Sequence, residues 1–293
     1  HHPVMINQKE YINHFHETLE MLEEPHGDSA AIPLNILTKK IHQSGIKTVL
    51  SGEGSDEIFL GYENYSKFLK YYEFEKSITN EQHDFLDDII GALQNNTKES
   101  EYLRRIVKKQ NLYNSFGEIY TDIQKKRLFK KVPQFKSETS KQDPVDWMSY
   151  IDLKIWLGES LLSKVDRISM GNSLEVRTPF LDFNLVNYMF SVDSKLKVGD
   201  TNKYLLKKIA SRYIPEEIIN RTKKGFNSPY NEWLNNEYKS SLLETVIDVN
   251  RKTNLFNEEY ILKIHELSKS NKFKQHFYSL FIFSLWYKKE YLS

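Results

Sequence analysis

A glycine-rich turn carries the residue types in this chain that are best suited to chemistry. The segment 48–62 reads TVLSGEGSDEIFLGY and follows a β-branched run at residues 46–50. A strand that ends in a turn at the start of a helix leaves several backbone N–H groups unpaired, and these suit phosphate oxygens. Glycines allow an anion to approach the backbone because no Cβ stands in the way. The segment therefore indicates a phosphate-binding turn.

Three carboxylates in the same turn limit what it could bind. Glu53, Asp56 and Glu57 would repel a bare phosphate. They indicate either Mg²⁺ between carboxylates and phosphates, or carboxylates that act as a helix cap and a base beside the phosphate. Taken alone, the pattern fits a capped structural turn as well as a nucleotide site.

A second segment, residues 161–182, combines an apolar helical stripe with a cluster of charges. The stripe predicts a buried helix that ends at Gly171-Asn172. The pattern favours an ion network that shapes the wall of a cleft, in which Arg177 would keep Glu175 or Asp182 paired; direct substrate contact is the alternative. The charged residues are Asp166, Arg167, Glu175, Arg177 and Asp182.

Two further segments are rich in lysine. Gly199-Asp200-Thr201 predicts a turn and helix cap, so Lys203 should fall in the first helical turn. The helix dipole disfavours a cation there, and an anion at the same place would explain it; a solvated surface lysine is the alternative. Lys223 belongs to the basic turn at residues 221–229, which is typical of a solvated surface.

Composition excludes several classes of function. Basic and acidic residues number 41 and 40, so the net charge of +1 offers no general attraction to nucleic acid. The chain has no cysteine, which excludes disulfides, thiolate metal sites and a cysteine nucleophile and favours a cytoplasmic location. No apolar run is long enough to span a membrane.

The order of the predicted elements indicates an α/β fold. Strands are expected at Pro3–Ile6 and Ile46–Leu50 within an α/β part, residues 1–75. Residues 76–293 should be mainly helical, with a long helix at Tyr150–Met170. Two short strands do not make a stable sheet, so either further strands hide in ambiguous apolar runs or the chain is the later part of a longer α/β protein.

Taken together and in order, these segments resemble the carboxy-terminal synthetase domain of the asparagine synthetase family. The resemblance rests on LSGEGSDE followed by Gly-Tyr, on LLxKxDRxSMxxSLExRxPFLD, on Lys-x-Leu-Leu and on Lys-x-Gly-Phe-x-x-Pro. These match residues 50–62, 161–182, 203–206 and 223–229. The loop at residues 24–33 also looks like the family's segment before the strand, and the resemblance spans about residues 1–235. Four ordered motifs are far more specific than any one of them.

The resemblance implies an adenine-nucleotide alpha-hydrolase-like (ATP pyrophosphatase) sheet, of which only the later strands are present. The family's first phosphate loop, SGG-x-D-S, and its cysteine-dependent glutaminase domain do not occur in these 293 residues. The expected parent is a ligase that uses ATP and Mg²⁺ to amidate aspartate through an acyl-adenylate, with ammonia delivered from glutamine by the glutaminase domain. The isolated chain is expected to be inactive, and a homodimer is a further assembly left open.

The resemblance also implies roles for individual residues. Glu53 would take a proton from the attacking amine, Lys203 would neutralise phosphate charge, and Asp56 would bind Mg²⁺. Because the motifs occur in the family's order, Lys203 and the turn Ser51–Glu57 should face one cleft, although about 150 residues separate them. The nucleotide contacts would come from Ser51, Gly52, Gly54 and Lys223. Two alternatives remain: a related amidoligase that forms lactams or amidates sugars or peptides, and a non-catalytic helical interaction module.

Overall fold

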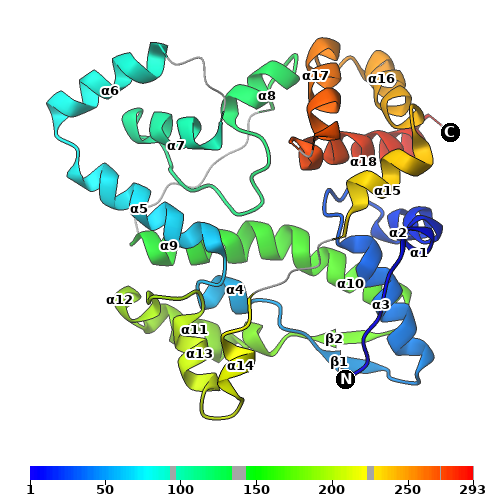
Figure 1. Ribbon diagram of the computed structural model, residues 1–293, viewed down its shortest axis with the longest axis horizontal. Helices are drawn as coiled ribbons and strands as arrows, with labels where there is room; N and C mark the ends of the chain where they lie inside the picture. The colour runs from blue at the N-terminus through cyan, green and yellow to red at the C-terminus, as the bar shows by residue number, and fades with distance from the viewer. Residues whose placement is uncertain (93–96, 134–142, 223–227, 271, 293) are drawn as a thin grey trace.

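One long helical segment crosses the middle of the molecule and organises the fold (Figure 1). The computed structural model describes residues 1–92, 97–133, 143–222, 228–270 and 272–292. Within it α9 (Pro144–Ile151), the π-helix η1 (Asp152–Leu161) and α10 (Leu162–Gly171) follow one another directly. The Asp143 carboxylate caps this segment by accepting the Val145 N–H, and Pro144 occupies the first turn, where its missing donor costs nothing. The long helix predicted from the sequence is confirmed, and it contains ten residues of π geometry.

The sheet consists of two parallel strands in the described residues. β1 (Thr48–Leu50) pairs with β2 (Glu175–Arg177), and Val49 lies opposite Val176. The predicted strand at Ile46–Leu50 is therefore confirmed over its last three residues, whereas β2 was not predicted. The strand predicted at Pro3–Ile6 is wrong. That segment finds no ladder partner among the described residues and instead packs Val4 and Ile6 against the main core.

Four helices precede or follow β1 in the amino-terminal part of the chain. They are α1 (Gln8–Asn13), α2 (Phe15–Leu22), α3 (Ala31–Gln43) and α4 (Ser55–Ile58). Asn7 and Glu10 form a capping box at the start of α1, which satisfies two backbone donors reciprocally. α10 packs on both α2 and α3, so the long segment and the amino-terminal helices form one body.

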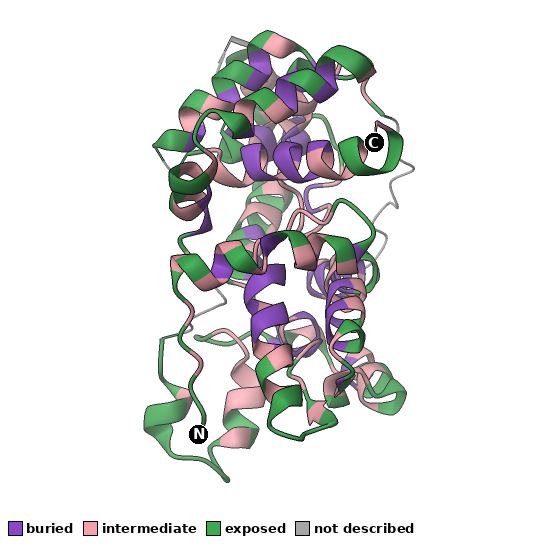
Figure 2. Ribbon diagram, turned by 90° about the vertical axis from the view of Figure 1, so that its right-hand side faces the viewer, coloured by how far each residue is buried: buried purple, intermediate pink, exposed green. Residues whose placement is uncertain are grey.

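The largest core lies between the amino-terminal helices and a carboxy-terminal bundle (Figure 2). The bundle comprises α15 (Tyr230–Tyr238), α16 (Ser241–Thr253), α17 (Glu258–Lys269) and α18 (Lys274–Tyr291). Fully buried side chains from both parts meet here, among them Phe15, Ile32, Ile261 and Ile264. Burial of each such side chain contributes about 1.5–3 kcal/mol before entropy is counted.

A second core lies between α5 (Glu63–Ser77), α7 (Lys98–Val107) and α9. The same part of the chain includes α6 (Asn80–Ala92), which packs on α7, and α8 (Asp122–Leu128), whose Leu128 joins the main core. Aromatic rings dominate this core, where Phe68 packs edge-on against Tyr102 and Tyr113. The abundant aromatic residues therefore serve packing. No helix in the described ranges is long and apolar enough to cross a bilayer.

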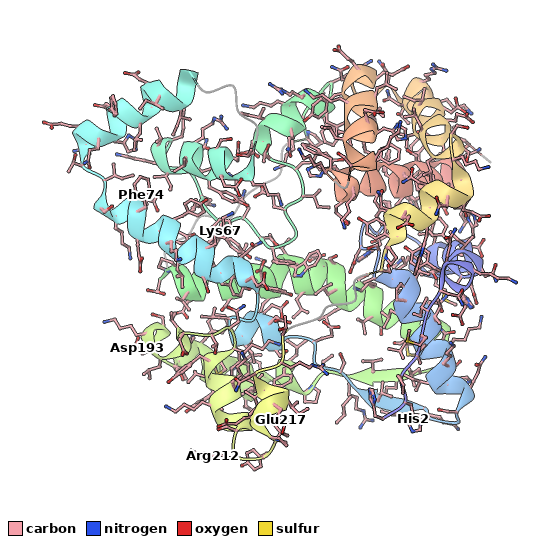
Figure 3. All side chains as sticks on the ribbon, in the orientation of Figure 1. His2, Lys67, Phe74, Asp193, Arg212 and Glu217 are labelled. Carbon is pink, nitrogen blue, oxygen red and sulfur yellow. The ribbon has the colours of Figure 1, made fainter. Side chains whose placement is uncertain are left out.

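A small helical layer lies below the long segment in Figure 1. It contains the 3₁₀ turn η2 (Pro179–Leu181), α11 (Phe183–Ser191), α12 (Ser194–Lys197), α13 (Tyr204–Ala210) and α14 (Glu216–Ile219). Asp193, Arg212 and Glu217 mark its outer ends in Figure 3. A buried ion pair, Lys197 Nζ to Asp146 Oδ1 at 2.7 Å, ties the layer to α9. The same layer contains Lys203, which lies at the start of α13.

Candidate functional site

The glycine-rich turn joins the end of β1 to α4. The Ser51 N–H donates to the Arg177 carbonyl at 2.8 Å, which continues the strand pairing into the turn. Ser51 Oγ accepts the Glu53 N–H at 3.2 Å and closes the turn. Gly54 adopts φ +89°, and a Cβ there would also collide with the Leu181 side chain. Glycine is required at residue 54 for both reasons.

Lys203 reaches this turn from the lower layer. Its ammonium donates to Ser55 Oγ at 2.8 Å and lies 3.2 Å from Asp56 Oδ1. The predicted convergence of Lys203 with the turn, across about 150 residues of sequence, is confirmed. The predicted place in the first helical turn is wrong by one residue, because Lys203 is the N-cap of α13 and has φ 57°. This left-handed backbone, held by a bond from the Lys203 N–H to the Leu60 carbonyl, orients the side chain toward α4.

Gly61 makes room for this pairing. A Cβ at residue 61 would overlap Asp56 Oδ1 and Lys203 Cε. The Gly61 N–H also donates to the Asp56 carbonyl at 2.7 Å. The glycine at residue 61 is therefore explained by close packing around the Asp56–Lys203 pair.

Glu53 lies at the apex of the turn, in a half-buried position. Burial raises its pKa, the nearby carboxylates of Asp56 and Asp28 act in the same direction, and the ammonium groups of Lys164 and Lys203 oppose the rise. A carboxylate with a raised pKa is a better proton acceptor than an exposed one. Glu53 thus stands between two lysines and two other carboxylates.

A buried ion pair forms the other side of the site. Lys164 on α10 is 6 % exposed, and its ammonium lies 2.5 Å from Asp28 Oδ2. Burial disfavours the Asp28 carboxylate, but the adjacent Lys164 ammonium outweighs this effect and lowers the pKa of Asp28. Both residues lie in motifs at residues 24–33 and 161–182, but no role was predicted for either of them. A lysine inside the apolar stripe of the helix was the signal that could have found them.

The loop that carries Asp28 is held from two directions. His26 Nε2 lies 3.0 Å from the Ser160 carbonyl on the long segment. On the opposite side, α18 binds the loop through a bond from Gln275 Nε2 to the Gly27 carbonyl and through the Trp286 indole, which donates to the Glu23 carbonyl at 2.9 Å. The loop that carries Asp28 is therefore held against both the long segment and α18.

The charged network predicted for residues 166–182 is wrong. Arg177 pairs with Glu175 at 2.8 Å, but both side chains are more than half exposed because they occupy the outward positions of β2. Asp182 is exposed and caps α11 by accepting two backbone N–H groups. Arg167 turns away to the Leu22 carbonyl and the exposed Glu23 and Glu24. These charges do not form one network.

One turn, the segment after β1, carries most of the predicted site residues: Ser51, Gly52, Glu53, Gly54 and Asp56. Lys223 falls outside the described residues. No group of three or more histidine, aspartate or glutamate side chains suited to a metal occurs in the described part of the chain.

Comparison with known proteins agrees with this arrangement. A sequence profile of the asparagine synthase family matches residues 1–288. The chain is 29% identical, over 97% of its length, to asparagine synthetase [glutamine-hydrolyzing] 1 of Bacillus subtilis, of which it covers 46%. It is 29% identical, over 78% of its length, to a putative asparagine synthetase of Mycobacterium tuberculosis, of which it covers 37%. It is 24% identical, over 79% of its length, to the amidase chyE of Penicillium rubens, of which it covers 39%.

The glycine-rich turn thus carries Glu53 and Asp56, and Lys203 reaches it from the start of α13. The chain belongs to the asparagine synthase family. It spans less than half the length of these curated relatives.

Proposed function

We propose that the full-length protein uses ATP to activate a carboxylate as an acyl-adenylate and then transfers ammonia to it, with aspartate as the acceptor and glutamine as the ammonia source. The observation that carries the proposal is the meeting of Lys203 with Ser55 and Asp56 at the turn after β1. Membership of the asparagine synthase family supports the same chemistry. The names of the bacterial relatives support aspartate and glutamine as substrates.

In the first step, an oxygen of the acceptor's side-chain carboxylate attacks the α-phosphorus of ATP. A carboxyl–phosphate bond forms, and the bond to pyrophosphate breaks. Negative charge grows on the phosphate oxygens, so a fixed ammonium beside them stabilises the transition state. Lys203 supplies that charge, and its bond to Ser55 keeps it at the turn. Ser51, Gly52 and Gly54 contribute backbone and hydroxyl contacts to the nucleotide.

In the second step, ammonia attacks the acyl carbon and AMP departs. The attacking nitrogen must lose a proton, and a carboxylate with a raised pKa is suited to accept it. Glu53 has this property because it is half-buried at the apex of the turn. The proton therefore passes to the Glu53 carboxylate as the amide forms.

The residues present fit a magnesium ion. Mg²⁺ is bound through one or two carboxylates together with substrate phosphates, and such a site needs no all-protein cage. Asp56 offers a partly exposed carboxylate beside the lysine that faces the phosphates. When bound, the ion would supply further charge neutralisation at the pyrophosphate.

One observation favours a second candidate. Two fungal relatives carry the name amidase, at 24% and 23% identity. A related amidoligase would use the same turn, the same lysine and the same adenylation step on a different carboxylate. Replacement of aspartate by other carboxylic acids in the assay below distinguishes the two candidates.

The test is aspartate-dependent exchange of labelled pyrophosphate into ATP by the full-length protein. Lys203→Ala should lower the exchange rate by ~10²–10³-fold, as expected when a preorganised charge at the reacting phosphates is removed. Lys208→Ala is the matched control, because Lys208 is an exposed lysine on the same helix, and it should leave the rate unchanged. A Lys203→Ala rate within threefold of the control would refute the proposed role.

A further inference from the structure

The π-helix η1 contacts both loops of the site. Ten residues, Asp152–Leu161, depart from α geometry in the middle of the long segment. Runs of π-helix are rare and frequently occur at functional sites. From this stretch Trp156 contacts the segment after the glycine-rich turn, and Ser160 contacts the loop that carries Asp28.

Trp156 begins a hydrogen-bonded chain that ends on α4. Its indole Nε1 donates to the Tyr62 hydroxyl at 3.1 Å, and that hydroxyl donates to Glu57 Oε1 at 2.5 Å. Glu57 is 1 % exposed and directly follows Ser55 and Asp56 on α4. Because a buried carboxylate keeps its orientation only while its partners are in place, the Tyr62–Trp156 pair fixes the face that α4 turns toward Lys203.

Aromatic packing makes this chain rigid. The Tyr62 ring stacks on Phe116 with 4.0 Å between centroids and 16° between planes, and Trp156 lies 5.6 Å from Phe116. A Cβ on Gly117 would stand 2.5 Å from Trp156 Cε3, so only glycine admits the indole there. The Tyr62 and Phe116 rings therefore stack face to face, and the Trp156 ring packs on Phe116 with its plane tilted by 55°.

A second buried carboxylate anchors the segment that supplies Phe116. Asp152, the first residue of η1, is fully buried. Its Oδ1 accepts the Phe116 N–H at 2.7 Å, and its Oδ2 accepts the Tyr65 and Tyr113 hydroxyls at 2.7 and 2.5 Å. The start of the π-helix is thereby joined to the aromatic stack that Trp156 completes.

The other end of η1 contacts the loop that carries Asp28. His26 Nε2 lies 3.0 Å from the Ser160 carbonyl and 3.2 Å from Ser160 Oγ. Four residues further along, Lys164 pairs with Asp28 of the same loop. One stretch of helix therefore touches α4 through Trp156 and the Asp28 loop through Ser160 and Lys164.

We propose that Trp156 is a positioning residue, and that the π-helix sets the spacing between the turn at residues 51–57 and the loop at residues 24–29. Trp156 contacts no reacting group itself and acts through Tyr62 and Glu57. The inference rests on the proposed function for its catalytic consequence. It assigns the distance between this turn and the Asp28 loop to the π geometry of residues 152–161.

The test compares two conservative indole replacements. Trp156→Phe keeps a ring in the stack but removes the donor to Tyr62. Trp147→Phe is the matched control, because Trp147 is a buried tryptophan of the same long segment whose Nε1 donates to the Tyr113 carbonyl at 3.0 Å. Tyr62→Phe removes both hydrogen bonds and keeps the stack, and it serves if Trp156→Phe fails to fold.

Two measurements are made on these variants. Amide hydrogen exchange of residues 51–62, which needs no activity, should accelerate about tenfold in Trp156→Phe and Tyr62→Phe and stay unchanged in Trp147→Phe. In the full-length protein the kcat for adenylation should fall about tenfold in the same two variants with the KM for ATP within twofold, since a misplaced catalytic group weakens the transition state more than ground-state binding. The double variant Trp156→Phe/Tyr62→Phe should show no faster exchange and no lower kcat than either single variant.

The outcomes separate the two proposals. Wild-type exchange at residues 51–62 and wild-type kcat in Trp156→Phe would overturn the positioning role. An equal rise in amide exchange and an equal fall in kcat in Trp147→Phe would also overturn the positioning role. Such a result would mean that replacing either tryptophan of the long segment has the same effect. Absence of adenylation in the wild-type protein would refute the proposed function, and the exchange measurement would still decide whether Trp156 holds the turn.

Discussion

Replacing Glu57 with glutamine should remove a pH dependence of stability that the fold imposes on this carboxyl group. Glu57 is 1 % exposed, and its Oε1 accepts the Tyr62 hydroxyl. Burial raises its pKa from 4.5 to about 7, an effect that the Tyr62 hydrogen bond opposes and the Asp56 and Asp152 carboxylates reinforce. Glutamine keeps an acceptor oxygen for Tyr62 and cannot ionise.

The direction follows from proton binding. In the unfolded chain Glu57 releases its proton near pH 4.5, whereas in the folded protein it does so near pH 7. Between these values the folded state holds more protons, so the free energy of unfolding falls as pH rises. At 1.36 kcal/mol per pH unit, the loss between pH 5.5 and pH 7 is about 2 kcal/mol, and it is complete above pH 7.

The assay is urea unfolding at pH 5.5 and pH 8 for the wild type and Glu57→Gln, with Glu63→Gln as the control. Glu63 is an exposed glutamate in the next helix. The wild type and the control should lose about 2 kcal/mol more than Glu57→Gln over this interval. Parallel pH dependence in the wild type and Glu57→Gln would refute the reasoning, because it would show that Glu57 has the same pKa in both states.

Two further substitutions test the site's construction. Arg177→Ala should leave the melting temperature unchanged, since its pair with Glu175 is exposed, and a clear drop measured by calorimetry would contradict the surface placement. Gly61→Ala should destabilise the fold by about 1–3 kcal/mol and lower adenylation, because the new methyl group must displace Asp56 or Lys203. Urea unfolding and pyrophosphate exchange measure the two effects, and wild-type values in both would refute the packing argument.

Local sequence patterns predicted the parts of this fold that depend on local physics. The β-branched run before Ser51 produced β1, the glycines after it produced the turn, and the apolar stripe around Val165 produced the long helix. Each of these features is set by backbone preferences and side-chain periodicity within about ten residues. The meeting of Lys203 with the turn was predicted from the order of the motifs.

Features set by tertiary contacts were not predicted. β2 has charged residues at both ends and gains its partner from a strand 127 residues earlier, as the Thr48–Glu175 pairing shows. The charges near residue 175 were assigned to an ion network in the wall of a cleft, because a sequence does not reveal which face of a short strand meets solvent. The π geometry of residues 152–161 was not predicted either. It accompanies tertiary contacts of Asp152 and Trp156, and such contacts leave no periodic pattern in the sequence.

The central claim is that the acceptor carboxylate becomes bonded to the α-phosphate of ATP. The full-length protein should be incubated with ATP, Mg²⁺, ammonia and aspartate carrying ¹⁸O in its side-chain carboxylate, and the nucleotide product analysed by mass spectrometry. An acyl-adenylate pathway transfers one labelled oxygen to each AMP when ammonia displaces it. Labelled orthophosphate together with ADP, or AMP without label, would contradict the account.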